Sequence, residues 1–152
     1  MNLDQFLGGM KSEIKHFELE NWYYHGFKVI NGANWKIAFD GYLEGYHFST
    51  AHKETILPMT KQGIMDFSSF GPHLRIAFAS TNIEEIYDLP KNEWWKKEGQ
   101  GVDFVRTLFP NISISLGLGI GQIAQILPGK TPDTNTTILH YLAPKKPKNN
   151  KE

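Results

Sequence analysis

The sequence predicts an α+β domain with a mainly antiparallel sheet. Two stretches with helical spacing stand among short β-type segments, and turn signals separate these segments. The chain lacks the sustained strand–helix–strand alternation that a parallel sheet requires. Its 152 residues correspond to the usual size of one domain. We therefore expect one hydrophobic core built from a sheet and a few helices.

The N-terminal part of the chain predicts one helix and one strand. Residues 3–17 place apolar side chains three and four positions apart, which is typical of an amphipathic helix, although Gly8-Gly9 lowers its helical propensity. Residues 19–30 are rich in aromatic and β-branched side chains, which favours a strand. The Asn31-Gly32 pair then predicts a turn.

A second helix and a hairpin follow. Residues 33–52 predict a helix, with Asn34 as its N-cap. Residues 64–70 and 74–80 alternate as strands do, and Gly71-Pro72 predicts the reversal between them.

The C-terminal half predicts a helical insert and three more strands. Residues 82–106 are charged and rich in Trp, which favours helical pieces broken near Pro90. Residues 111–118, 122–127 and 136–142 predict strands, which gives six strands in total. The final residues are rich in Lys, Asn and Pro and predict a solvated tail.

Charge and cysteine content exclude several classes of protein. Sixteen Lys and Arg balance 16 Asp and Glu, so no general electrostatic attraction to nucleic acid or anionic lipid is expected. The absence of cysteine excludes disulfides, thiol nucleophiles, Cys-ligated zinc and iron–sulfur clusters on this chain. We find neither a signal peptide nor an apolar run long enough to span a membrane. The sequence therefore predicts a cytoplasmic protein without nucleic-acid or membrane partners.

The densest group of potentially catalytic side chains lies in the second predicted helix. Asp40, Glu44 and His47 stand at positions i, i+4 and i+7, and so on one helical face. His52 lies about 140° further around an ideal helix than His47, so the two imidazoles could bind one ion only if the helix ends or distorts between them. Interleaved aromatic residues indicate that the helix is buried, and a metal ion would be one way to satisfy the buried polar groups. The alternative is two ordinary histidines and a solvated carboxylate face.

This segment resembles the mononuclear-iron motif of Rieske-type ring-hydroxylating oxygenase α subunits. Residues 3–8 also resemble the linker that follows the Rieske domain of that family, and residues 109–113, 125–128 and 140–141 resemble later parts of its catalytic domain. The resemblance thus extends over most of the chain. The elements of the iron motif are Asn34-Trp35-Lys36, Asp40, Glu44, Tyr46-His47 and His52.

The resemblance implies a role for each polar residue of the motif. His47 and His52 would be two ligands of a mononuclear non-haem Fe(II), held in a 2-His-1-carboxylate arrangement that leaves positions open for O2. Glu44 would be the carboxylate that bridges His47 to a cluster-ligating histidine of the neighbouring subunit, and so the electron-transfer link. Asp40 would lie near the oxygen-binding site. Most members of the family carry Asp at the bridge and Asn at the position of Asp40.

Substrate-pocket residues and the third ligand are also implied. Gly41 and Phe48 are candidates for the lining of the substrate pocket. The family takes its third iron ligand from a carboxylate on a helix after the last strand, so this ligand is expected beyond Glu152. Because the chain has no cysteine, the Rieske 2Fe-2S cluster is expected only on an N-terminal domain that this sequence lacks.

The fold that the resemblance implies is a helix-grip (START/Bet v 1-like) domain. In this fold a mainly antiparallel sheet wraps around a long helix and leaves an apolar cavity between them. Residues 1–143 would be a partial catalytic domain and residues 144–152 the tail. A helix held by a sheet needs an apolar face. The residues expected to be buried on that face are Trp35, Ile37, Leu43 and Tyr46.

The implied activity is hydroxylation of an aromatic or other hydrophobic small molecule with O2. Electrons would come from NAD(P)H through a ferredoxin/reductase chain, and the assembly would be a homo-oligomer, a trimer with electron transfer between subunits. The truncated chain alone is expected to be inactive. Two alternatives stay open: a metal-free helix-grip domain that binds a hydrophobic ligand, and a zinc hydrolase that uses Glu44, His47 and His52.

Overall fold

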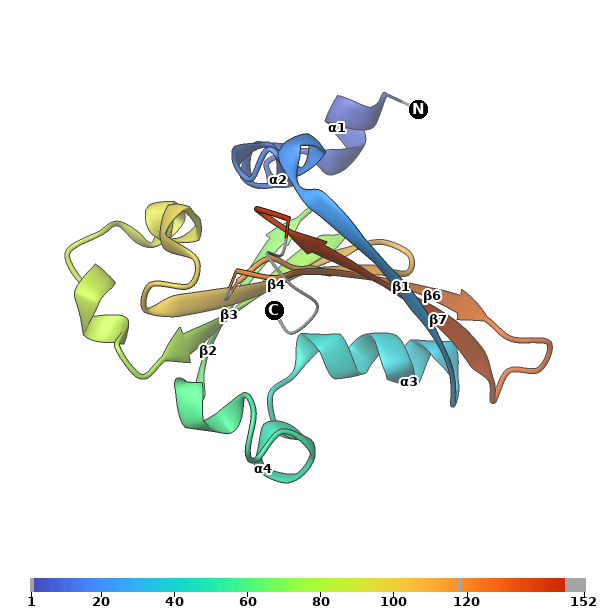
Figure 1. Cartoon of the computed structure of the whole chain (residues 1–152). Helices are drawn as coiled ribbons and strands as arrows, with labels where there is room; N and C mark the ends of the chain where they lie inside the picture. Colours follow the sequence, from blue (N-terminus) through green and yellow to red (C-terminus); the bar gives the residue numbers. More distant parts are fainter. Residues whose placement is uncertain (1, 118, 147–152) are drawn as a thin grey trace.

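The computed structural model describes residues 2–117 and 119–146, whose strands form one antiparallel sheet in the order β1-β7-β6-β5-β4-β3-β2 (Figure 1). This confirms the predicted α+β class. Six strands follow one another along the chain as neighbours in the sheet, and β1 joins the far edge by pairing with β7. The strands are β1 (Tyr23–Gly32), β2 (Thr60–Phe70), β3 (His73–Ser80), β4 (Val102–Leu108), β5 (Ile112–Ser115), β6 (Gly121–Pro128) and β7 (Asn135–Ala143).

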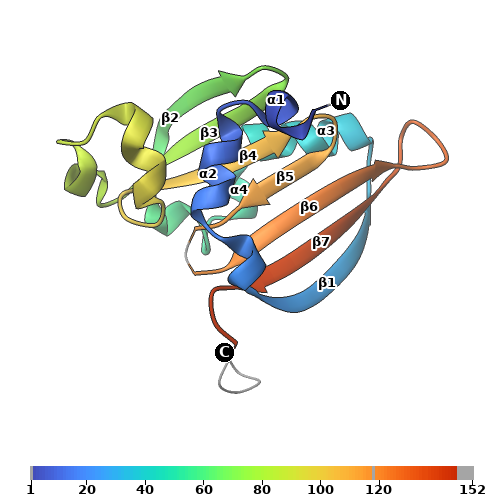
Figure 2. The ribbon, with the colours of Figure 1, turned by 90° about the horizontal axis from the view of Figure 1, so that it is seen from above.

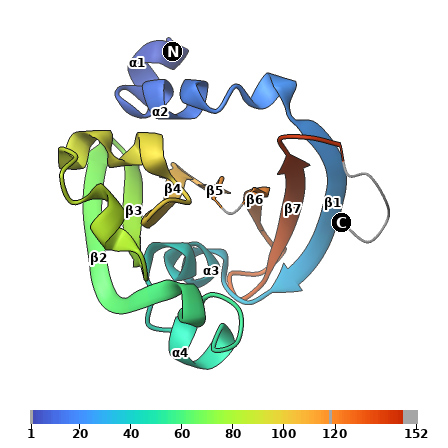
Figure 3. The ribbon, with the colours of Figure 1, turned by 60° about the vertical axis from the view of Figure 1, so that its left-hand side comes forward.

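Short helices lie on both faces of the curved sheet. Figure 3 shows α1 and α2 on its outer side and α3 and α4 on its inner side, and Figure 2 shows α2 above β4. None of the helices in the described part of the chain is long and apolar enough to cross a membrane. The α-helices are α1 (Leu3–Leu7), α2 (Met10–His16), α3 (Trp35–Asp40) and α4 (Phe48–Ala51). The 3-10 helices are η1 (Leu19–Asn21), η2 (Gly41–Leu43), η3 (Leu57–Met59), η4 (Ile83–Ile86) and η5 (Lys91–Lys97).

Two predicted boundaries are confirmed by local geometry. The side-chain oxygen of Asn34 accepts a hydrogen bond of 2.8 Å from the backbone N–H of Lys36, so Asn34 is the N-cap of α3. The hairpin between β2 and β3 turns at Gly71, whose φ of 62° is a conformation that favours glycine.

Two predicted elements differ from the structure. The N-terminal helix is interrupted at Gly8, whose φ of 53° cannot continue a helix. The helical insert is shorter than predicted, because residues 102–108 form the strand β4. In the sequence, the charged residues Asp103 and Arg106 interrupt the alternation of apolar residues that is typical of a strand. The predicted strand over residues 111–118 ends at Ser115, and Leu118 lies outside the described residues.

Apolar clusters cover both faces of the sheet. On the outer face, η4 and η5 pack on a cluster of β3 and β4 that includes Ala77 and Phe104. On the inner face, α3 packs on Ala124, Ile126 and Leu139 of β6 and β7. The sheet therefore holds this helix as a helix-grip fold requires. The residues of α3 and η2 in the inner cluster are Trp35, Ala38, Phe39 and Tyr42, which share one helical face.

Four residues are expected to be buried on the helix that the sheet holds, and this prediction is wrong for two of them. Ile37 is 68% exposed and Tyr46 is 78% exposed, whereas Trp35 and Leu43 are half-buried. Ile37 lies on the side of α3 opposite to its packed face. Tyr46 lies in the turn that follows η2, where no helix continues.

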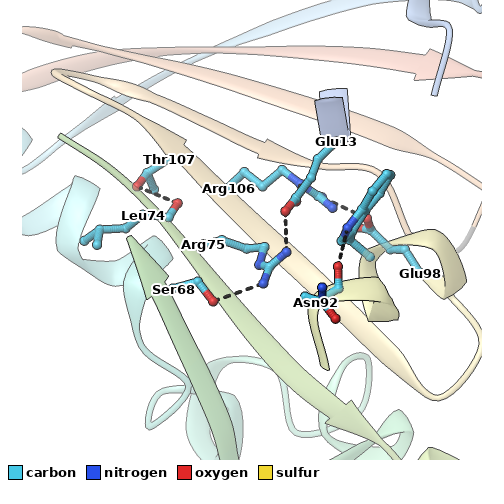
Figure 4. Close-up of polar contacts among 9 residues, drawn as sticks. Glu13, Ser68, Leu74, Arg75, Asn92, Glu98, Arg106 and Thr107 are labelled. Atoms are coloured by element: carbon cyan, nitrogen blue, oxygen red, sulfur yellow. Dashed lines mark hydrogen bonds and ion pairs between the residues drawn. The ribbon is translucent and has the colours of Figure 1, made fainter. Parts of the chain in front are cut away.

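A buried ionic network fixes α2 to the outer face of the sheet (Figure 4). Glu13 of α2 is 3% exposed and pairs with two arginines, Arg75 of β3 and Arg106 of β4, which lie opposite each other in register. The Arg106 Nε–Glu13 Oε2 distance is 2.9 Å, and Arg106 Nη1 also lies 2.8 Å from Glu98 Oε2. Each arginine therefore has a carboxylate partner, and both arginines are buried.

Replacing Glu13 by Ala should lower the free energy of unfolding by about 3–5 kcal/mol, since breaking a buried pair leaves Arg75 without a carboxylate partner, whereas Arg106 keeps Glu98. Denaturant unfolding of the 152-residue chain measures this change. Glu20→Ala is the matched control, because Glu20 is exposed on the neighbouring η1. A loss for Glu13→Ala as small as that of the control would mean that the network does not stabilise the attachment of α2.

Candidate metal centre

The segment that carries the predicted metal ligands is a broken helix. After α3 and the 3-10 turn η2, Glu44 has the extended angles φ −145° and ψ 163°, and α4 starts only at Phe48. The prediction that Asp40, Glu44 and His47 share one face of a continuous helix is therefore wrong. One break lies before His47, and α4 then ends at Ala51, so the helix also ends between the two histidines. Gly45 lies within the break before His47 and packs closely against the sheet, since a Cβ at that position would lie 3.0 Å from the Phe78 ring.

The short helix α4 brings the two predicted histidine ligands together, because it ends at Ala51 and His52 leaves the helical path with φ −123° and ψ 28°. His47 and His52 flank the single turn of α4, as its N-cap and C-cap residues. Their ring centroids are 5.1 Å apart, with an angle of 67° between the ring planes. Phe48 contacts both rings edge to face, with centroid distances of 4.9 Å to His47 and 5.9 Å to His52. The two imidazoles thus converge from the two ends of one helical turn.

Glu44 orients the ring of His47. The Nδ1–H of His47 donates to Glu44 Oε1, while Glu44 Oε2 accepts from the backbone N–H groups of Tyr46 and, at 3.3 Å, of His47. Burial alone would raise the pKa of Glu44, but the hydrogen bonds from the His47 ring and the Tyr46 backbone bring this pKa below its usual value. A carboxylate on Nδ1 fixes the ring and directs Nε2 toward a metal, as in many protein metal sites.

A cavity of about 550 Å³ lies beside these residues, between the α3–α4 segment and the inner face of the sheet. Its volume is in the range of small-molecule sites, and most of its walls are apolar. Gly41 and Phe48, the predicted pocket residues, both line it, whereas Asp40 is exposed and is not among the lining residues. The lining residues are Ala38, Gly41, Tyr42, Glu44, His47, Phe48, His52, Ile56, Phe78, Val105, Ser115 and Gln122.

The sheet contributes a wall that the sequence analysis did not identify. Phe78, Val105, Ser115 and Gln122 come from four successive strands, β3 to β6, and point to the same face. Ser115 is opposite both Val105 and Gln122 in register. The period-2 alternation of each strand shows which of its residues share a face. Which of the two faces lines the cavity becomes known only once the strands are paired.

The two histidines have the chemistry of metal ligands, although they are only part of a complete ligand set. Neither His47 Nε2 nor the His52 ring has a hydrogen-bond partner among residues 2–117 and 119–146, and neutral imidazole nitrogens bind iron readily. In the same part of the chain, no cluster of three His, Asp or Glu side chains is placed to hold a metal. Glu44 is occupied with His47 Nδ1, so it is not positioned as a ligand of the same ion.

The fold and the site together define a helix-grip α+β domain with a pair of histidines at an apolar cavity. The family model of the ring-hydroxylating alpha subunit (catalytic domain) matches residues 18–152. The chain therefore belongs to the family of ring-hydroxylating oxygenase alpha-subunit catalytic domains, as its resemblance predicts. No curated protein matches the sequence.

Solved structures of a quaternary ammonium Rieske monooxygenase, CntA, share the fold. The complex with the inhibitor MMV12 has a TM-score of 0.75 at 11% identity, over 99% of this chain and 39% of that chain. The complex with the substrate L-carnitine has a TM-score of 0.72 at 12% identity, over 99% of this chain and 38% of that chain. The chain thus spans about two fifths of the length of these relatives. The helix-grip prediction is confirmed at the level of the fold.

Proposed function

We propose that residues 1–143 are a partial catalytic domain of a Rieske non-haem iron oxygenase, followed by a tail from residue 144. The single observation that carries this proposal is the His47–His52 pair at the wall of an apolar cavity, with Glu44 on Nδ1 of His47. Membership of the family supports it, since the family uses a non-haem iron and a Rieske cluster. Part of the tail, residues 147–152, lies outside the described residues.

In this proposal His47 and His52 hold Fe(II), and a carboxylate supplied from outside the described residues completes the ligand set. Bound Fe(II) would supply the redox chemistry for O2 activation. The residues of this chain hold the two imidazoles, exclude water and place a hydrophobic substrate beside the imidazoles. Phe48, Phe78 and Val105 suit that last task, because they present apolar surface to the cavity.

Glu44 is proposed as the electron-transfer bridge between His47 and a cluster-ligating histidine of a neighbouring subunit. Its lowered pKa and its contact with Nδ1 support this role, since a carboxylate can accept a second hydrogen bond from an incoming imidazole. The proposed partners are a second copy of the chain in a homotrimer and a ferredoxin/reductase chain that delivers electrons from NAD(P)H. One of the related structures is described as giving insight into inter-subunit electron transfer.

Asp40 is proposed to lie near the oxygen-binding site. Its side chain is exposed at the end of α3 and does not line the cavity. A carboxylate there could exchange protons with water at the surface.

A metal-free ligand-binding domain is the second candidate. It is favoured by one observation, that the described residues do not group three metal-binding side chains. The zinc hydrolase is the weaker alternative, because Glu44 faces Nδ1 of His47 and not a position shared with both imidazoles.

Iron content separates the two candidates. We expect weak and poorly selective binding of Fe(II), Co(II) and Zn(II) by the 152-residue chain, since two imidazoles alone provide few ligands. In the chain joined to its natural flanking sequences, iron should be stoichiometric and reductant-driven O2 consumption should depend on an aromatic substrate. A flanked protein that takes up hydrophobic ligands but no iron would support the metal-free alternative.

A further inference from the structure

A second and smaller cavity, of about 110 Å³, adjoins the proposed substrate cavity. The two cavities are neighbouring compartments, because five residues line both of them. The shared residues are Phe48, Ile56, Phe78, Val105 and Ser115. The residues that line the smaller cavity alone are Met59, Thr60, Asp103, Phe104 and Gly117.

Asp103 is the one ionisable residue among the lining residues of the smaller cavity. It lies on β4 opposite Phe78, and its Oδ2 accepts a hydrogen bond of 3.0 Å from the Ser80 hydroxyl. Its Oδ1 is buried and has no hydrogen-bond partner among the described residues. A Cβ on Gly117 would lie 2.4 Å from this oxygen, so the carboxyl group fits only because residue 117 lacks a side chain.

The charge of Asp103 is not balanced by a basic residue in the described part of the chain. The nearest arginine along β4, Arg106, points to the outer face and is paired with Glu13 and Glu98. Burial raises the pKa of Asp103, and the hydrogen bond from Ser80 offsets this only in part. An ionised carboxylate in such a place is costly unless a cation accompanies it.

The walls of the smaller cavity also suit a cation. The rings of Phe48 and Phe78 line both compartments, and their centroids are 5.0 Å apart. The faces of aromatic rings attract ammonium groups within about 6 Å of the ring centroid. A volume of 110 Å³ exceeds the roughly 30 Å³ that one water molecule occupies in the liquid, so an ammonium group and an adjoining carbon fit there.

We infer that the smaller cavity binds the protonated amine end of a substrate whose apolar body lies in the larger cavity, with Asp103 as its counter-charge. Asp103 is thus a specificity-determining residue, and Ser80 positions its carboxylate. This inference rests on the proposed role of the larger cavity as the substrate site.

The test compares two probes of the same shape, benzylamine and benzyl alcohol, by calorimetric titration of the 152-residue chain at neutral pH. Benzylamine should bind more tightly, and Asp103→Asn should weaken its binding about 10- to 100-fold, the usual effect of losing a buried hydrogen bond to a charged group. The affinity for benzyl alcohol should change little. Asp88→Asn is the matched control, since Asp88 is exposed and lines neither cavity.

Equal affinity of the wild type and Asp103→Asn for benzylamine would overturn the inference and leave the proposed function standing. If neither probe binds, the result contradicts both the inference and the proposal that the larger cavity is a substrate site. Metal binding at His47 and His52 is measured in a separate experiment. The affinity of the wild type for benzoate is a further measurement, and it needs no variant. If the wild type binds this anion as tightly as benzylamine, Asp103 does not act as a counter-charge.

Discussion

Replacing His47 or His52 by Ala should abolish iron binding in the protein that contains the natural flanking sequences. Each change removes one of the two imidazoles that converge beside the cavity, where the ring centroids are 5.1 Å apart. Loss of a residue that only orients a ligand already costs about 10- to 100-fold in metal affinity, so loss of a ligand should cost more. Iron quantitation after anaerobic purification measures the effect.

His140→Ala is the matched control for these two variants. His140 lies on β7, its ring nitrogen is 3.0 Å from the Tyr24 hydroxyl, and it is not among the residues that line the cavity. His73 is unsuitable, because it is fully buried and bonded to the backbone of Phe6 and Phe109. Normal iron content after loss of either cavity histidine would mean that the proposed ligand set is wrong.

The sequence predicts the strands best where a strand is flanked by a local turn. Residues 64–70 and 74–80 alternate around Gly71-Pro72, and this hairpin is present with its turn in place. The strand β4 was missed for a physical reason. Arg106 and Asp103 look solvated in the sequence, but Arg106 is 0% exposed and pairs with Glu98 and with Glu13, which lies 93 residues earlier. Such a partner is not visible in a local pattern.

The candidate site shows the same limit. Spacing alone left open whether the two histidines meet, and the family resemblance supplied the stronger argument. The structure brings them together because α4 is a single turn that ends at Ala51, so that His47 and His52 are its two cap residues. The inner wall of β3 to β6 depends on strand register, which tertiary packing determines. Local sequence therefore predicts the chemical groups better than their surroundings.

Replacing Glu44 by Gln should reduce turnover by orders of magnitude in the proposed oligomer with both the iron and the Rieske cluster, while the iron stays bound. The amide oxygen of Gln can still accept the hydrogen bond from Nδ1–H of His47, so the ring should keep its orientation. The change removes the negative charge that would receive the cluster histidine of the neighbouring subunit. Electron transfer between subunits should then fail, although the cluster itself is still reduced normally.

The measurements are iron content, reduction of the cluster and reductant-driven turnover on the same preparation. Glu54→Gln is the matched control, since Glu54 is exposed in the turn after α4 and does not line the cavity. Lost turnover with retained iron supports the bridge, because only the electron path depends on the charge of Glu44. Lost iron would instead make Glu44 a direct ligand. Turnover equal to that of the control would make Glu44 an ordinary carboxylate that only holds the ring of His47.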